Sequence, residues 1–174
     1  MLIARSLQEA GLYVELHPCE CGAAGELTFG VVERDGETLA VYEGDCPGCG
    51  RARRFEFRLP AEPVAGPAYG GEEPSRIVDA GEFLWYSDRA TEQAFRLSAE
   101  TDDDAVARGR SALEVAAAAL DEVRKFVPAG ATAVPREAIG SELGQALYDA
   151  DPDRFTLDTL AGRRRLLDDA LART

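Results

Sequence analysis

The chain has 174 residues, 45% of them hydrophobic, and a formal net charge of −13. It has no apolar run long enough for a membrane-spanning helix, and its first residues lack a secretory signal pattern. We therefore expect a cytoplasmic protein with no membrane contact. The acidic balance argues against a general nucleic-acid surface, because phosphate binding depends on clustered lysine and arginine, and it favours a basic protein partner. Lys125 is the only lysine, and this arginine-rich composition is typical of a GC-rich bacterial genome.

The first sixty residues predict a small sheet. Residues 2–10 predict a short helix that ends at Gly11. The Asp35-Gly36 pair between two apolar runs predicts a hairpin turn. Alternating apolar and polar positions predict four strands, over 12–17, 26–34, 37–44 and 52–60.

The remaining residues predict a linker and a group of helices. Asp79, followed three residues later by Glu82, predicts a capping box at the start of a helix. Later apolar positions recur at the three-four spacing of amphipathic helices, so we expect three to four helices. The predicted fold is α+β, with an N-terminal antiparallel sheet, a Pro/Gly-rich linker and a C-terminal helical region, over 1–60, 61–74 and 75–174 respectively.

Two close cysteine pairs flank the predicted hairpin, Cys19 with Cys21 and Cys46 with Cys49. Each pair lies in a tight turn, and the hairpin would bring the turns together so that four thiolates surround one tetrahedral ion. We therefore predict one structural Zn²⁺ ion at these four residues. The second turn, CPGCG, matches the CPxCG knuckle of zinc-ribbon proteins, and the segment over 17–50 resembles them. This resemblance implies a zinc-ribbon-like β domain, an element found in proteins of many functions.

Other interpretations of the cysteines remain open. His17, the only histidine, is an alternative ligand to Cys19, because the CxC turn is tighter than a CxxC turn. A disulfide framework is disfavoured in the reducing cytosol. A redox CxxC motif normally opens a helix, whereas a strand is predicted after Cys49. A catalytic zinc needs an open coordination position, and no convincing acid or base flanks the cysteines.

Two pairs of residues are candidate partner-binding positions. Arg53 and Arg54 alternate with phenylalanines on the last predicted strand. They suit phosphates or an acidic partner, but the same alternation is typical of a strand with one buried and one solvated face. Trp85 and Tyr86 belong to a run of four bulky residues on a predicted helix. Four such neighbours cannot all face one core, so we expect some of them at a second surface, formed by another part of the chain or by a partner.

These patterns support three functional hypotheses. The leading one is a non-enzymatic zinc-binding protein that acts through protein–protein interaction, for example an acidic inhibitor or immunity protein. After residue 60 there are 22 acidic against 13 basic residues, which favours a contact between the helical half and a basic partner. The second hypothesis is nucleic-acid-linked regulation, and the third is a zinc enzyme. The sequence contains no P-loop, GxGxxG, GxSxG or HExxH motif.

Overall fold

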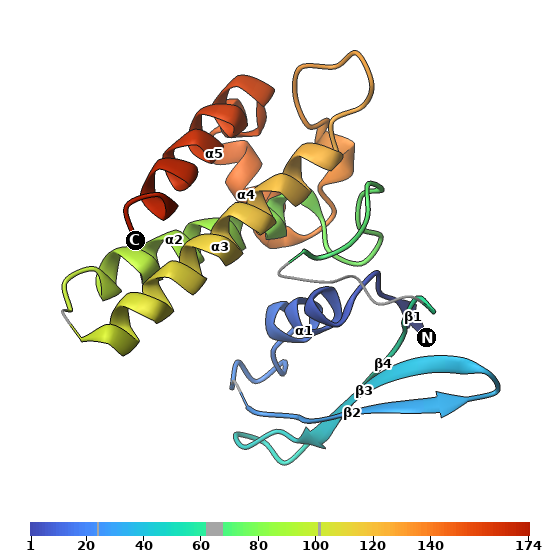
Figure 1. Cartoon of the computed structure of the whole chain (residues 1–174). Helices are drawn as coiled ribbons and strands as arrows, with labels where there is room; N and C mark the ends of the chain where they lie inside the picture. Colours follow the sequence, from blue (N-terminus) through green and yellow to red (C-terminus); the bar gives the residue numbers. More distant parts are fainter. Residues whose placement is uncertain (24, 62–67, 101) are drawn as a thin grey trace. The chain divides into compact units, whose positions relative to one another are not determined.

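The chain forms two compact units in a computed structural model that describes residues 1–23, 25–61, 68–100 and 102–174. The sheet unit comprises Met1–Gly71 and Ser75–Val78, and the helical unit comprises Glu72–Pro74 and Asp79–Thr174 (Figure 1). Residues 62–67 of the predicted linker lie outside the described residues.

The sheet unit contains a mixed sheet in the strand order β1-β4-β3-β2. Its elements are β1 (Leu2–Ile3), α1 (Leu7–Leu16), β2 (Thr28–Arg34), β3 (Glu37–Asp45) and β4 (Ala52–Arg58). β3 pairs antiparallel with both β2 and β4, whereas β1 pairs in parallel with β4. The prediction of a purely antiparallel sheet is therefore wrong, because the chain begins with a parallel strand and not with a helix.

The segment before the first cysteine pair also differs from the prediction. Residues 12–17 do not form a strand, because α1 runs through them to Leu16. The Ser6 hydroxyl accepts a hydrogen bond from the Glu9 amide at 3.0 Å and caps a helix that starts at Leu7, five residues later than predicted. Gly11 lies inside the helix, beside the Tyr42 hydroxyl, and does not end it. An alternation of six residues is too short to separate a strand from a helix.

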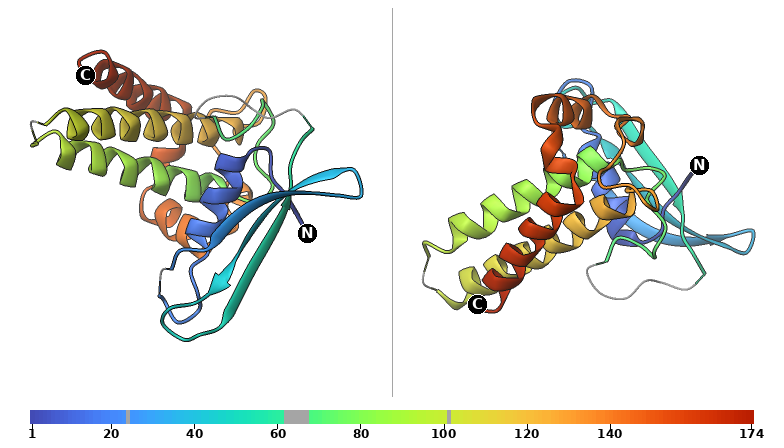
Figure 2. Two further views of the ribbon diagram at one scale, coloured as in Figure 1. Left: turned by 60° about the horizontal axis from the view of Figure 1, so that its bottom comes forward. Right: turned by 90° about the horizontal axis from the view of Figure 1, so that it is seen from above.

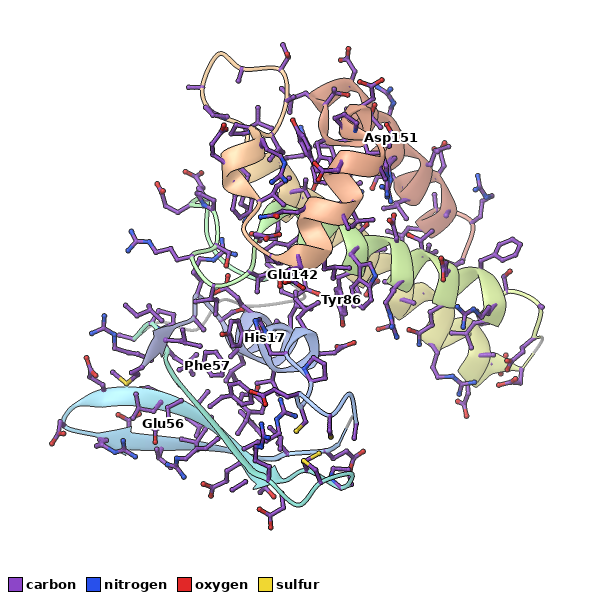
Figure 3. All side chains as sticks on the ribbon, turned by 180° about the vertical axis from the view of Figure 1, so that it is seen from behind. His17, Glu56, Phe57, Tyr86, Glu142 and Asp151 are labelled. Atoms are coloured by element: carbon purple, nitrogen blue, oxygen red, sulfur yellow. The ribbon has the colours of Figure 1, made fainter. Side chains whose placement is uncertain are left out.

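The predicted hairpin between β2 and β3 is confirmed. Asp35 and Gly36 have φ values of 55° and 79°, as a type I′ turn requires. α1 lies across one face of the sheet (Figure 2), and the core there is formed by the buried residues Ala4, Ala10, Ala40 and Phe57. Figure 3 shows Phe57 on this side of β4 and its neighbour Glu56 on the other. Tyr13, Val14, Tyr42 and Phe55, which are partly buried, pack against this cluster.

The helical unit contains α2 (Ala80–Leu97), α3 (Asp103–Lys125), α4 (Glu142–Ala150) and α5 (Leu157–Leu171). Short 3₁₀ turns occur at Arg136–Ala138 and Pro152–Phe155. α2 and α3 lie side by side in opposite directions (Figures 1 and 2). The alanines of α3 allow this close approach, and the Ser87 hydroxyl of α2 donates to the Ala116 carbonyl of α3 at 2.9 Å.

The start of α2 is tied to the start of α4. The capping box predicted at Asp79 is present. The other oxygen of the same carboxylate accepts hydrogen bonds from the amides of Gly140 at 2.9 Å and Ser141 at 2.6 Å. Gly81 of α2 faces Gly144 of α4, and a Cβ atom at Gly81 would overlap the Cα atom of Gly144. One aspartate therefore fixes two segments that are about sixty residues apart in sequence.

Candidate metal centre

The first cysteine turn follows the end of α1. The amide of His17 donates to the Tyr13 carbonyl at 3.1 Å, and its ring stacks on the Tyr13 ring at a centroid distance of 3.9 Å. The Arg53 guanidinium donates to the His17 carbonyl. The Gly22 amide closes the turn by donating to the Cys19 carbonyl at 2.7 Å. His17 is thus held against Tyr13 and is not part of the cysteine cluster.

The second cysteine turn connects β3 to β4. The Gly50 amide donates to the Cys46 carbonyl at 2.8 Å, and Gly50 has a φ of 67°, a conformation that glycine adopts without strain. Gly48 lies against the first turn. A Cβ atom at Gly48 would lie 2.7 Å from the Cβ of Ala23 and 3.3 Å from the sulfur of Cys21. The two turns therefore approach each other so closely that a side chain at position 48 would fit only if the turns moved apart.

All four cysteine sulfurs lie within 4.8 Å of one another. The distance is 3.6 Å between the sulfurs of Cys19 and Cys49, and 3.5 Å between those of Cys21 and Cys46. A disulfide bond would require about 2.05 Å, and all four cysteines are free. Four sulfurs bound to one zinc ion at about 2.3 Å would be separated by about 3.8 Å. The cluster is therefore compatible with a tetrahedral metal site.

Backbone amides stabilise negative charge in this cluster. The N–H groups of Cys49 and Gly48 donate to the sulfur of Cys46 and lower the pKa of Cys46 to about 6. The N–H of Arg51 acts in the same direction on Cys49, but the three other sulfurs outweigh it and raise the pKa of Cys49 to about 11. Thiolates this close repel one another, and a divalent cation between them would remove that repulsion.

An ion pair between Arg51 and Glu20 joins the two turns at the surface. The hydrogen bond from Arg51 lowers the pKa of Glu20, and Glu20 raises the pKa of Arg51 in turn. This pair was not predicted from the sequence. Glu20 lies between Cys19 and Cys21, and Arg51 lies two residues after Cys49, so the pair forms only when the two turns come together. The contribution of such an exposed pair to stability is small.

The predicted partner-binding arginines are engaged within the sheet unit. Arg54 forms ion pairs with Glu43 and Glu56, the latter at 2.6 Å. The Arg53 guanidinium lies over the Phe55 ring, 5.2 Å from its centroid. Acidic neighbours therefore balance the charge of Arg54, as expected of a solvated strand face.

The predicted partner-binding aromatic residues lie on α2 in the helical unit. Trp85 and Tyr86 are each half-buried. The Arg89 guanidinium lies 4.8 Å from the centre of the Trp85 ring system, where it can form a cation–π contact. Figure 3 marks Tyr86 on this helix. A role of these two residues in partner binding stays a prediction.

Comparisons with known proteins identify no relative. No protein-family model, no curated protein and no solved structure matches the chain. Within the described ranges, none of the helices combines the length and apolar character needed to cross a membrane.

Proposed function

We propose that Cys19, Cys21, Cys46 and Cys49 bind one structural Zn²⁺ ion. The short distances between the four sulfurs support this proposal. Four thiolates fill the coordination shell of a tetrahedral ion and leave no position for a water molecule, which favours a structural role over a catalytic one. The resemblance to zinc-ribbon proteins now rests on the two cysteine turns alone, because the rest of the sheet unit has a mixed sheet and a helix.

The ion would constrain a segment of the sheet unit whose described residues have no regular secondary structure. One buried cluster of this unit consists of three alanines and Phe57, and Leu12, Leu39, Val41, Tyr69 and Val78 are buried in the same unit. The described residues between α1 and β2 form no helix or strand. Zinc would tie this segment to the turn between β3 and β4. Metal binding in such small units is coupled to folding, because the unfolded chain holds no preformed site.

Metal analysis of the full chain tests the zinc site directly. We expect elemental analysis of protein purified without chelator to find one zinc per chain. After replacement by Co²⁺, we expect the absorption bands of a tetrahedral tetrathiolate complex. The variant C46S should lose the metal, whereas H17A should retain it, because His17 lies outside the cluster. Protein without metal, or equal metal loss in both variants, would contradict this ligand set.

We further propose that the protein acts through contact with a protein partner and not through catalysis. A coordination shell closed by four sulfurs supports the absence of metal-based catalysis. Glutamates pair with Arg34, Arg54 and Arg58 of the sheet, which weighs against phosphate binding by these arginines. The acidic excess after residue 60 favours a basic partner for the helical unit. An acidic inhibitor or immunity protein would be one form of this function.

Affinity capture from a native lysate, with identification by mass spectrometry, tests the partner proposal. We expect a basic protein whose retention decreases as the salt concentration rises, because screening shortens the reach of the charges. Removal of acidic residues from the helical unit should weaken its capture. Specific binding of DNA or RNA at physiological salt would instead support the nucleic-acid hypothesis.

A further inference from the structure

β2 is an open edge of the sheet in the part of the chain that the structure describes. It pairs with β3 on one side and ends the strand order on the other. All of its residues except Gly30 are exposed, and Phe29 and Val31 are each 48% exposed. Proteins usually protect an edge strand with a proline, a lysine or a bulge. β2 contains neither residue type, and its register with β3 is continuous.

We propose that β2 pairs antiparallel with β2 of a second copy of this chain, across a two-fold axis. The hydrogen-bonding groups of this edge are already aligned. In a type I′ hairpin the residues that flank the turn form a hydrogen-bonded pair, here Arg34 and Glu37. Every second residue of β2 from Arg34 therefore directs its N–H and C=O toward β3. The residues between them, Phe29, Val31 and Glu33, direct theirs toward the free edge.

A main-chain hydrogen bond of Thr38 in β3 supports this assignment independently. Glu33 lies opposite Thr38 in the β2–β3 register. The carbonyl of Thr38 accepts from the Leu59 amide at 2.9 Å, on the β4 side of β3. Thr38 therefore does not bond through its main chain to Glu33, and the main-chain groups of Glu33 point outward.

The sequence of this edge complements itself in one register. With Gly30 on the two-fold axis, Phe29 lies opposite Val31 of the partner subunit, and four backbone hydrogen bonds join these residues and their symmetry mates. The apolar side chains then cluster on the face where Phe29 already lies 4.9 Å from the Tyr42 ring. On the other face, Glu26 lies opposite Arg34 of the partner subunit. A two-fold axis at Val31 would instead place Arg34 opposite Thr28 of the partner subunit and lose this charge pair, which is less favourable.

Both charged residues of this register are accessible to a partner, and Glu26 precedes the start of β2 by two residues. Glu26 is exposed. The Arg34 side chain is 50% exposed, and its contact with Glu56 is a surface ion pair at 3.3 Å that it can share. The assembly closes on itself, because the other edge of each sheet is β1, which has two residues. Pairing through β2 therefore yields a dimer and not a fibre. These observations favour β2 of a second copy, and not a strand of an unrelated protein, as the pairing partner.

Sedimentation velocity on the full chain over a concentration series tests the dimer. One strand pair is a small interface, so we expect a dissociation constant on the order of tens of micromolar. V31K should weaken the dimer at least about tenfold, because it places a charge on the pairing edge. V106K is the matched control: Val106 is 46% exposed but lies on α3 in the helical unit, so this variant should dimerise like the unmodified chain.

Charge reversal tests the register. E26R and R34E should each weaken the dimer about three- to tenfold, because each places like charges opposite one another. The double variant E26R/R34E should restore it. Circular dichroism shows whether each variant remains folded. A chain that stays monomeric at all concentrations, a V31K variant that dimerises normally, or an equal loss in V106K would overturn the proposal. Failure of the double variant to restore dimerisation would overturn the register.

Discussion

Replacement of Gly48 by alanine tests how tightly the two cysteine turns must fit for metal binding. The new Cβ would lie 2.7 Å from the Cβ of Ala23, whereas apolar carbon atoms in contact are separated by about 3.5 to 4.0 Å. The turns must therefore separate by about 1 Å. This movement would carry Cys21 away from Cys46, whose sulfurs now lie 3.5 Å apart. It would also disturb the hydrogen bond from the Gly48 amide to the Cys46 sulfur.

Both effects act on the ligand geometry, so we expect G48A to bind zinc about 10- to 100-fold more weakly, a loss of about 1.4 to 2.7 kcal/mol. Competition with a chromogenic chelator measures this affinity. G71A is the control, because nothing lies within 4 Å of a Cβ atom at that position. Thermal unfolding in excess chelator separates a metal effect from a folding effect. Unchanged zinc affinity in G48A, or an equal loss in G71A, would refute the steric argument.

Three further predictions concern pH, helix capping and salt. Because the pKa of Cys46 is lowered to about 6, a proton competes with the metal at this sulfur only below that pH. Chelator competition at a series of pH values should therefore show zinc affinity falling more steeply below about pH 6 than above it. D79A should destabilise the helical unit by about 2 to 3 kcal/mol, because it removes the helix cap and the acceptor of two further amide hydrogen bonds. D79N should reduce the stability less, because its side-chain oxygen can still accept hydrogen bonds. Denaturant unfolding followed by fluorescence of Trp85, the only tryptophan, measures this loss, and equal effects of both variants would contradict it. Binding of a basic partner to the helical unit should weaken with rising salt, and a salt-independent affinity measured by calorimetry would argue against an electrostatic contact.

Some local signals in the sequence predicted the local structure correctly. The Asp35-Gly36 pair specifies its own turn, because both residues accept positive φ values. Asp79 and Glu82 lie one helical turn apart and cap each other without help from the rest of the chain. The cysteine cluster was also predictable, because a hairpin between the two tight turns brings the turns together. Such features depend on a few neighbouring residues and can be predicted from one sequence.

The predictions were wrong where residues that are distant in the sequence determine the local structure. Leu2 and Ile3 become a strand only because β4 lies beside them, and Phe57, the partner of Leu2, is far away in sequence. Nothing in the first residues indicates this parallel pairing. Glycine often ends a helix. Here the N-cap is Ser6 and α1 packs against the sheet, so the helix continues through Gly11 to Leu16. The ion pair between Glu20 and Arg51 likewise depends on the folded arrangement of the turns.

The unequal exposure of the four cysteine residues has a consequence for the kinetics of metal exchange. Cys19 and Cys46 are 5% and 3% exposed, whereas Cys21 and Cys49 lie at the surface. A chelator can reach a bound ion only from the side of the exposed pair, so these two sulfurs would be displaced first. The buried pair would release the ion only when the two turns separate. Metal loss should therefore proceed in two steps, and at high chelator concentration its rate should approach the rate at which the turns open.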